Sequence, residues 1–406
     1  MKTIKSFLFF WVMLLLLIQK TNAQPGTLDT SFGKGGVVSY DTMTDNSDAL
    51  IQPDGKIVEL SSSFHGYSIK VRRFNPDGTF DSTFGIYGQA SIVFPGFLLP
   101  HNIAIQEDGK IVFTGDYLSN GHTNVGITRC NVDGSIDSSF GNNGFDTIFL
   151  DNITFATGLA IQQDGKIVVS GDLRKNIYDD ERTFISRRLP NGGPDSSFGK
   201  DGNVVNHYNV SINSIALLIR PNGKLVIGST FNTFSEHASY MLASFNPDGS
   251  VNSSFGENGI AQYIFGEGQS ETWNSLMESM ALQPDGKIVC VGISGTDDPL
   301  MAICRFNEDG TTDLGFGENG SLITPYLDYH NMYVNDVAIQ PDGKIVTSGV
   351  SWKWSYTPFT LLLTRYTDQG QLDPLFGKEG ISAIDTPSGM SANHVFILPD
   401  GKIFTS

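Results

Sequence analysis

One seven-residue phrase constrains the fold of this chain more than any other feature. The letters QPDGKIV occur at residues 52–58, 283–289 and 340–346, and close variants occur at 106–112, 162–168, 220–226 and 398–404. The Asp or Asn before the Gly recurs at intervals of 54, 56, 58, 63, 57 and 58 residues. A fixed period of this length predicts one structural unit copied along the chain.

Two further motifs share this period. A motif containing Phe-Gly, such as FDSTFGIYG at 80, occurs seven times, and motifs of the RFNPDG type start at 73, 129, 188, 244, 305 and 365. In the period 335–381 we expect strands over 335–340, 344–349 and 360–365. We expect the FG motif at 372–381 to form a fourth strand. No segment of the period has the pattern of a ten-residue helix.

The repeated phrase has the chemistry of a β-hairpin turn. Pro sets φ for the first turn position, Asp tolerates the second, and Gly supplies the left-handed conformation that closes the hairpin. Asn222 replaces the Asp in one copy, while Glu107 and Gln163 replace the Pro in two others. These exchanges keep turn propensity but change charge, so the phrase is interpreted as a turn rather than as a catalytic or metal-binding motif.

Four short antiparallel strands per period predict an all-β, seven-bladed β-propeller. The Phe of each FG motif is interpreted as a wedge between neighbouring blades. The seventh blade is incomplete, because its first two strands are followed by Ser406 with no third strand. We expect the FG motif at Leu28–Gly36 to complete that blade as its fourth strand. We also expect the natural chain to continue past Ser406, and whether it continues into a sorting domain is left open.

The two motifs "AIQPDGKIVxxG" and "RFNPDGxxDxxFGxxG" resemble the delta-60 repeat family. The resemblance covers residues 27–406 and implies β-propeller blades in an exported bacterial protein. It implies no catalytic residues, because that family has no settled molecular activity.

The N-terminus has the pattern of a secretory signal peptide. Lys2 and Lys5 precede an apolar run over 7–18, and Thr21-Asn22-Ala23 supplies small residues before a cleavage site. We therefore expect a signal peptide at 1–23, a propeller at 24–406, and a secreted or cell-surface location. A membrane anchor is the alternative, but the apolar run is short for spanning a bilayer.

Charge limits the classes of partner. The net charge is −17, and it becomes about −20 without the first 23 residues, which hold three Lys and no acidic residue. This balance argues against nucleic acid and against anionic membrane surfaces. We expect a monomer that is not inserted in a membrane after cleavage of the signal peptide.

The three cysteines do not form a disulfide framework. Cys130 occupies a position that other repeats fill with Phe, Leu or Tyr, so it is interpreted as a small core residue. Cys290 and Cys304 could face each other across one hairpin, and whether they are bonded is left open.

No catalytic, cofactor or metal motif is evident in the sequence. The acids around the second turn, such as Asp77 and Asp81, resemble the tail of a calcium loop, but Arg73 stands where the first ligand belongs. We interpret them as turn acids, with calcium as the alternative, and expect the recurrent Arg to pair with a turn Asp. The seven His share no ligand spacing, and no cofactor is predicted.

Binding is predicted on one face of the ring. In a four-stranded meander, the repetitive turns lie on one face, and the variable connections lie on the other. Aromatic residues in the variable connections could stack on sugars or anchor a protein partner. The candidate ligand-binding residues are Trp352, Trp354, Tyr356, Trp273 and Tyr329.

Three functions follow from these observations. The leading hypothesis is a recognition module for a protein or a glycan. The first alternative is an enzyme of the lyase or hydrolase type, with a site at the mouth of the central channel built from separate blades. The second alternative is a passive structural or display domain.

Overall fold

The computed structural model describes residues 25–39, 44–63, 68–94, 96–119, 121–150, 153–174, 182–206, 211–232, 238–266, 274–295, 300–324, 332–351, 360–385 and 392–406. Every regular element in these ranges is a β-strand, so the prediction of an all-β protein is confirmed. The predicted signal peptide at 1–23 lies outside them. Within these ranges, no helix has the length and apolar character needed to cross a bilayer.

The strands form six consecutive antiparallel meanders of four strands, here called units 1 to 6, followed by a hairpin. One parallel pairing, of Thr123 with Ile153, joins units 2 and 3 into a single eight-stranded sheet. Unit 1 contains β1 (Thr44–Ile51), β2 (Ile57–Ser63), β3 (Ile69–Phe74) and β4 (Gln89–Ile92). Unit 2 contains β5 (Phe97–Ile105), β6 (Ile111–Ser119), β7 (His122–Cys130) and β8 (Phe145–Ile148). Unit 3 contains β9 (Ile153–Ile161), β10 (Ile167–Arg174), β11 (Arg182–Arg188) and β12 (Asn203–Asn206).

The remaining units repeat this order. Unit 4 contains β13 (Ser211–Ile219), β14 (Leu225–Asn232), β15 (Ser239–Phe245) and β16 (Ile260–Tyr263). Unit 5 contains β17 (Asn274–Leu282), β18 (Ile288–Gly295), β19 (Leu300–Phe306) and β20 (Ser321–Ile323). Unit 6 contains β21 (Met332–Ile339), β22 (Ile345–Ser351), β23 (Thr360–Tyr366) and β24 (Ile381–Asp385). The hairpin contains β25 (Val395–Ile397) and β26 (Ile403–Thr405).

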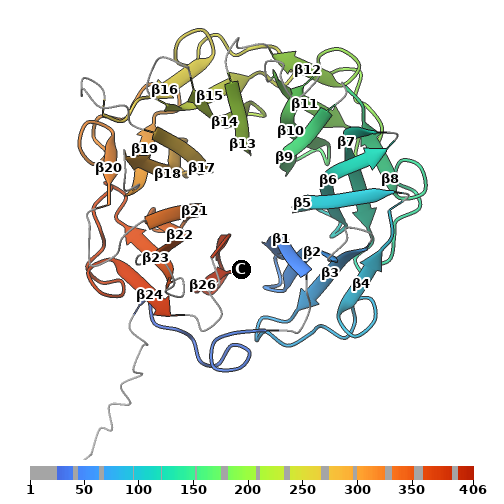
Figure 1. The fold of residues 1–406 in the computed structure, drawn as a ribbon, viewed down its shortest axis with the longest axis horizontal. Helices are drawn as coiled ribbons and strands as arrows, with labels where there is room; N and C mark the ends of the chain where they lie inside the picture. The colour runs from blue at the N-terminus through green and yellow to red at the C-terminus, as the bar shows by residue number, and fades with distance from the viewer. Residues whose placement is uncertain are drawn as a thin grey trace, which may run out of the picture.

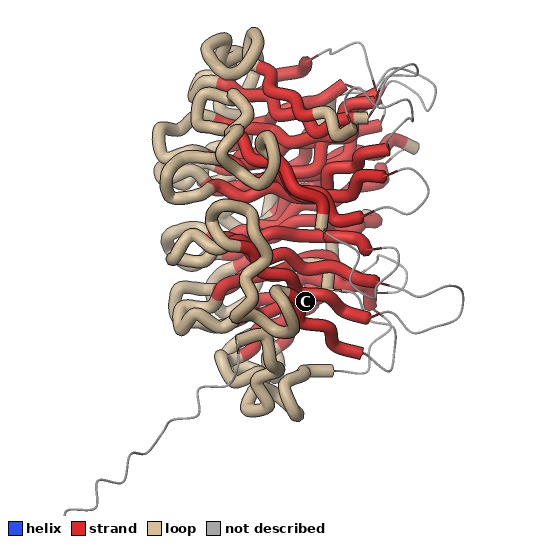
Figure 2. Tube along the Cα trace, turned by 90° about the vertical axis from the view of Figure 1, so that its left-hand side faces the viewer, coloured by secondary structure: helices blue, strands red, loops and turns tan. Residues whose placement is uncertain are grey.

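The units are arranged in a ring, with the first strand of each unit innermost and the fourth outermost (Figure 1). The first strands of successive units contact each other around the ring. In the side view, the described turns and loops gather mainly on one side of the ring (Figure 2). This side, here called the turn face, carries the repeated DG turns and the FG motifs, as the meander topology predicts.

The FG motif is a loop, which corrects the prediction that it forms the fourth strand. In unit 6, the Phe376 amide donates to the Asp373 carbonyl at 3.0 Å, and the Gly380 amide donates to the Phe376 carbonyl at 2.9 Å. Gly377 and Glu379 have φ angles of 52° and 55°, which an extended strand does not allow. The fourth strand therefore starts only after the motif, and the predicted strand at Leu28–Gly36 is likewise a loop.

The hydrophobic core lies between neighbouring units rather than within one. Each core cluster combines side chains from two successive sheets, and one cluster joins unit 6 to the last hairpin. The Phe of the FG motif is at most 1 % exposed in all six units. Its interpretation as a wedge between blades is therefore confirmed at Phe84, Phe140, Phe198, Phe255, Phe316 and Phe376.

The N-terminal segment joins the two ends of the ring. The Gly377 amide of unit 6 donates to the Pro25 carbonyl at 2.8 Å. Asp29 pairs with Lys402 of the last hairpin at 2.9 Å, and the Gly33 amide donates to the Asp77 carbonyl of unit 1 at 2.8 Å. Residues 25–33 therefore contact unit 6, the hairpin and unit 1 in turn.

The cysteines belong to the core. Cys290 and Cys304 lie opposite each other on β18 and β19, and all three cysteines are buried free thiols. Burial raises the pKa of the Cys304 thiol, and it raises the pKa of Cys130 to about 12. The burial of Cys130 confirms its interpretation as a small core residue.

Candidate functional site

A buried ion pair between an Arg and an Asp, here called the Arg–Asp joint, recurs beside the FG motif. In unit 1, Arg73 Nε donates to Asp81 Oδ2 at 2.7 Å, and Arg73 Nη1 donates to the Val132 carbonyl of unit 2 at 2.7 Å. The Arg73 guanidinium also lies 4.6 Å from the centre of the Phe84 ring. The same Arg–Asp pair occurs in units 2, 3, 5 and 6, as Arg129–Asp137, Arg187–Asp195, Arg305–Asp313 and Arg365–Asp373.

This joint confirms that the recurrent Arg pairs with a turn Asp. It also shows that the motif of unit 3 starts one residue earlier than the sequence suggests. In unit 3 the sequence motif starts at Arg188, but Arg187 makes the pair with Asp195, with Nε 2.8 Å from Oδ2. Arg188 instead contacts Asp146 of unit 2 at 3.0 Å. The Arg–Asp joint is buried and bonded to the next unit, so its role is structural.

The acids of the second turn accept hydrogen bonds from residues of the same turn. Asp77 Oδ1 accepts bonds from the Thr79 amide at 2.9 Å and the Thr79 hydroxyl at 2.6 Å, and these bonds lower the pKa of Asp77. Among the described residues, no group of three or more His, Cys, Asp or Glu has a geometry suited to a metal ion. The calcium alternative therefore rests on the sequence pattern alone.

The five aromatic residues predicted to bind a ligand lie outside the described residues. Trp273, Tyr329, Trp352, Trp354 and Tyr356 all fall in undescribed connections between strands. They stay predictions.

A cluster of acids and one His lies on the inner strands, where units 1 and 6 approach the hairpin. His394 Nδ1 is 3.7 Å from Asp48 Oδ1 and 4.0 Å from Asp336 Oδ2. Asp48 Oδ2 accepts the Ile103 amide of unit 2, and Asp336 Oδ2 accepts the Val395 amide of the hairpin, each at 2.9 Å. Both acids thus bond the backbone of the next element while facing the same imidazole.

Burial changes the ionisation of this inner cluster. Desolvation raises the pKa of Asp48 to about 6, although His394 and two backbone amides oppose it. Desolvation also raises the pKa of Asp336, against the hydroxyl of Ser279. The side chains of Asp48, Asp336 and His394 are 15, 21 and 28 % exposed, so water reaches all three. Two carboxyls that titrate above their usual range beside a His form a candidate acid–base group.

The sequence carried a signal for this cluster. Asp48, Asp336 and His394 each stand six residues before the Asp of a DG turn, at a place where other repeats have Asn102, Ser279 or Gly158. Alignment of the repeats would have shown that one inner position is polar in several units. That these three units lie next to one another follows from ring closure, which the repeat pattern does not reveal.

A groove lies at the outer edge of unit 2, around strand β8. Its volume is about 590 Å³. Its aromatic lining comes from Phe94, Tyr117, Phe145 and Phe149. Phe94 packs edge-on against Tyr117 and Phe145, with ring centres 4.8 and 4.7 Å apart. Phe149 is 64 % exposed, so its ring is free to meet a ligand.

The same groove has a polar lining. Asn142 and Ser139 come from the FG loop, Asp146 and Thr147 from β8, and Asn191 from the second turn of unit 3. The groove reaches from this turn to Ser119 and Phe149, where the connections on the opposite side begin. Sequence reasoning missed the groove, because its residues come from three units and share no motif.

Comparison with known proteins supports the fold. Residues 52–84, 106–140, 162–198, 220–255 and 283–316 match the family described as "Domain of unknown function (DUF5122) beta-propeller". These five segments are consistent with a β-propeller built from repeats. No curated protein matches the chain.

Two solved structures are similar to this chain over most of its length. The crystal structure of polysaccharide lyase Uly1 aligns over 95 % of this chain and 90 % of its own, with 10 % identity and a TM-score of 0.51. Extracellular domains 1–2 of Drosophila semaphorin 1b align over 89 % of this chain and 83 % of their own, with 8 % identity and a TM-score of 0.44. The first of these likenesses shows a shared β-propeller fold.

Proposed function

We propose that this protein is an exported recognition module that binds a glycan in the groove at the outer edge of unit 2. The observation that carries the proposal is the groove's mixed lining, which places the exposed Phe149 ring beside hydroxyl, amide and carboxyl groups. Sugars present apolar C–H faces and polar edges, and such a lining matches both.

The size of the groove favours a glycan over a folded protein. A volume of about 590 Å³ lies in the range of small-ligand sites. Its polar lining comes mainly from short side chains, which hydrogen-bond hydroxyl groups without a charge requirement. A protein partner remains the alternative, bound through the predicted aromatic residues of the opposite face.

The test is a glycan array followed by calorimetry on any glycan that binds. Phe149→Ala removes the exposed ring and should weaken binding by about 1–3 kcal/mol, with little change in melting temperature. Leu375→Ala is the matched control, because Leu375 is 72 % exposed on the FG loop of unit 6, away from the groove. An unchanged glycan affinity in Phe149→Ala, or a protein that binds no glycan, would contradict the proposal.

The inner cluster favours a second candidate function, an enzyme that uses acid–base chemistry. Asp48 and Asp336 titrate above their usual range beside His394, and a general acid or base needs a pKa near the working pH. The assay is incubation with uronate-containing polysaccharides, followed by reducing ends and by the absorbance of unsaturated products. Activity that is lost in His394→Gln but kept in Phe149→Ala would place function in the inner cluster.

We also propose a seventh blade, membership of the repeat family, export and a monomeric state. The N-terminal loop and the hairpin β25–β26 would form a seventh blade, supported by the contacts of Asp29 and Gly33 on either side of it. The motif resemblance assigns the repeats to the delta-60 family. Export rests on the signal-peptide pattern at residues 1–23, and the expected monomer is testable by light scattering.

A further inference from the structure

Unit 4 departs from the Arg–Asp joint of the other units. Elsewhere, one edge of the guanidinium, formed by Nε and Nη2, faces a carboxylate of the same chain. Arg305 shows this arrangement, with Nε and Nη2 both 2.8 Å from Asp313 Oδ2. Such an edge matches the two oxygens of one carboxylate. In the other units with this pair, a carboxylate of the chain itself therefore occupies the Nε–Nη2 edge of the guanidinium.

Two substitutions remove this pair from unit 4, and a third introduces an Arg at another position. Ser244 stands where the Arg of the third strand belongs, and Asn252 stands where the Asp belongs. Arg220 stands at the end of the first strand, where Gln52, Gln106, Gln162, Gln283 and Gln340 occur in the other units. The guanidinium of unit 4 therefore approaches the joint from a different strand.

Arg220 takes over one contact of the missing Arg. Its Nη1 donates to the Glu308 carbonyl of unit 5 at 2.6 Å, which corresponds to the bond from Arg73 to Val132 in unit 1. Asn252 offers Arg220 no acceptor, because its amide oxygen accepts Lys224 Nζ at 3.1 Å and the Ser254 hydroxyl at 2.8 Å.

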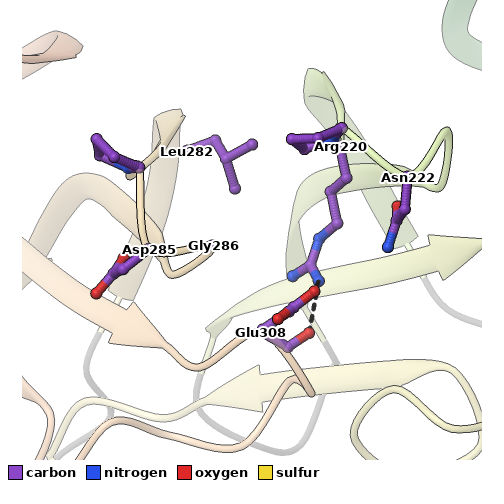
Figure 3. A pocket seen from close by; sticks show the side chains of 8 residues that line it. Arg220, Asn222, Leu282, Asp285, Gly286 and Glu308 are labelled. Atoms are coloured by element: carbon purple, nitrogen blue, oxygen red, sulfur yellow. Dashed lines mark hydrogen bonds and ion pairs between the residues drawn. The ribbon is translucent and has the colours of Figure 1, made fainter.

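The other edge of Arg220 has no hydrogen-bond partner. Arg220 is 5 % exposed, and its Nε and Nη2 are shielded from solvent without making a hydrogen bond, while the guanidinium carbon lies 5.5 Å from the centre of the Phe255 ring. The residue lines a pocket of about 220 Å³ between the first turns of units 4 and 5, with Leu282, Gly286 and Glu308 on the other walls. Figure 3 shows the guanidinium reaching into this pocket beside Glu308.

Two acids border the pocket and limit what it can hold. Asp285 lies 3.8 Å from Lys287, which balances part of its charge. The Glu308 carboxylate is 3.8 Å from Arg220 Nη1, a distance too long for a hydrogen bond, and its side chain is 67 % exposed. Glu308 can therefore turn into solvent when another anion approaches the guanidinium.

We propose that this pocket binds the carboxylate of a small ligand, which pairs with the Nε–Nη2 edge of Arg220 once Glu308 moves aside and this edge becomes accessible. One guanidinium bordered by two acids favours a monoanion over a phosphate or a sulfate dianion. The volume admits a ligand up to about the size of one sugar. The site lies on the turn face, and it is separate from the groove of unit 2.

The test compares sodium acetate, sodium glucuronate, neutral glucose and sodium sulfate at matched ionic strength, with melting temperature and calorimetry as readouts. Acetate and glucuronate should raise the melting temperature saturably, since a ligand that binds the native state stabilises it. A larger effect of glucuronate identifies an acidic sugar as the source of the carboxylate, and equal effects identify the carboxylate alone. Sulfate as effective as acetate, or no saturable effect of either carboxylate, would overturn the proposal.

Arg220→Gln places at this position the residue that five other units carry, so the variant should fold. It should weaken carboxylate binding by about tenfold or more, the usual effect of losing charged hydrogen bonds. Glu308→Ala removes the competing carboxylate and should tighten binding about two- to fivefold. Equal carboxylate affinity in Arg220→Gln and the unmodified protein would refute the assignment.

A rebuilt joint gives a second, independent check. The triple variant R220Q/S244R/N252D restores the arrangement of the other units, in which the chain supplies its own carboxylate. It should keep or raise the melting temperature and should lose the response to acetate and glucuronate. A triple variant that still binds either carboxylate would show that the guanidinium edge is not the binding group.

Discussion

Substitution of Asp137 by Asn tests whether the buried Arg–Asp pair holds neighbouring units together. Asp137 Oδ2 lies 2.7 Å from Arg129 Nη2 and 2.9 Å from Lys110 Nζ, and Asp137 Oδ1 accepts the Ser139 hydroxyl at 2.6 Å. Burial alone would raise the pKa of Asp137, but the bonds from Ser139 and Lys110 and the charge of Arg129 hold it well below its usual range.

The expected cost follows from what remains after the substitution. Arg129 is 5 % exposed, so Asp137→Asn leaves its guanidinium buried beside a neutral amide oxygen in place of a carboxylate. Removal of one partner from a buried ion pair costs about 3–5 kcal/mol. Since the Asn amide keeps the shape and one acceptor, we expect a value of about 3 kcal/mol, measured by urea denaturation with melting temperature as a second readout.

Unit 4 supplies the control for this experiment, because it carries Ser244 and Asn252 at the two corresponding positions. The double variant R129S/D137N copies that pair into unit 2. It should cost at least about 2 kcal/mol less than the sum of the single changes, because neither buried charge is left alone. A cost below about 1 kcal/mol for Asp137→Asn, or strict additivity in the double variant, would refute the reasoning.

Three further predictions concern turns, pH and thiols. Gly343→Ala should lower the free energy of unfolding by about 1 kcal/mol, because φ at Gly343 is +85°; a Cβ there would meet its nearest neighbour at an ordinary 3.6 Å, so the cost comes from the backbone. Gly315→Ala is the control, because Gly315 has no positive φ, and it should be nearly neutral in the same denaturation assay. Stability should fall as pH rises from about 4 to 7, because the folded-state pKa of Asp48 is raised to about 6 and that of Glu278 to about 7, so the folded state holds protons that the unfolded state has released. Below about pH 4 stability should fall again, because the pKa of Asp195 is lowered to about 2 in the folded state. Melting temperature measured against pH checks both limbs. A profile that rises steadily from pH 4 to 8, or one that is unchanged in Asp48→Asn, would contradict this account. The buried Cys304 should react with a thiol reagent only after unfolding, because burial raises its pKa and excludes the reagent; rapid labelling of the native protein would contradict the packing.

Local features of the architecture were predictable because their causes are local. A DG turn sets its own hairpin through the positive φ of Gly343 and the bonds of the turn backbone, so a repeated turn predicts repeated hairpins. Seven copies of one phrase then predict a ring of similar sheets. The wedge role of Phe84 and the pairing of Arg73 with Asp81 were also predictable, since both recur at constant spacing.

The fourth strand was misplaced because an apolar Phe in a short motif resembles a strand residue. Gly377 and Glu379 have positive φ, and only the backbone shows that the motif turns there. The one-residue error at Arg188 has a similar origin, since two adjacent Arg residues fit the motif equally well. The contact between Arg187 and Asp195 selects one of them.

The candidate sites depended on tertiary structure. His394 lies between Asp48 and Asp336 only because the first unit, the sixth unit and the hairpin meet when the ring closes. The groove of unit 2 combines Phe94 with Asn191, which are far apart in the sequence. Repeat periodicity describes what each unit does alone. Burial, raised pKa values and nitrogens without a hydrogen bond, such as Nε and Nη2 of Arg220, arise where two different units face each other.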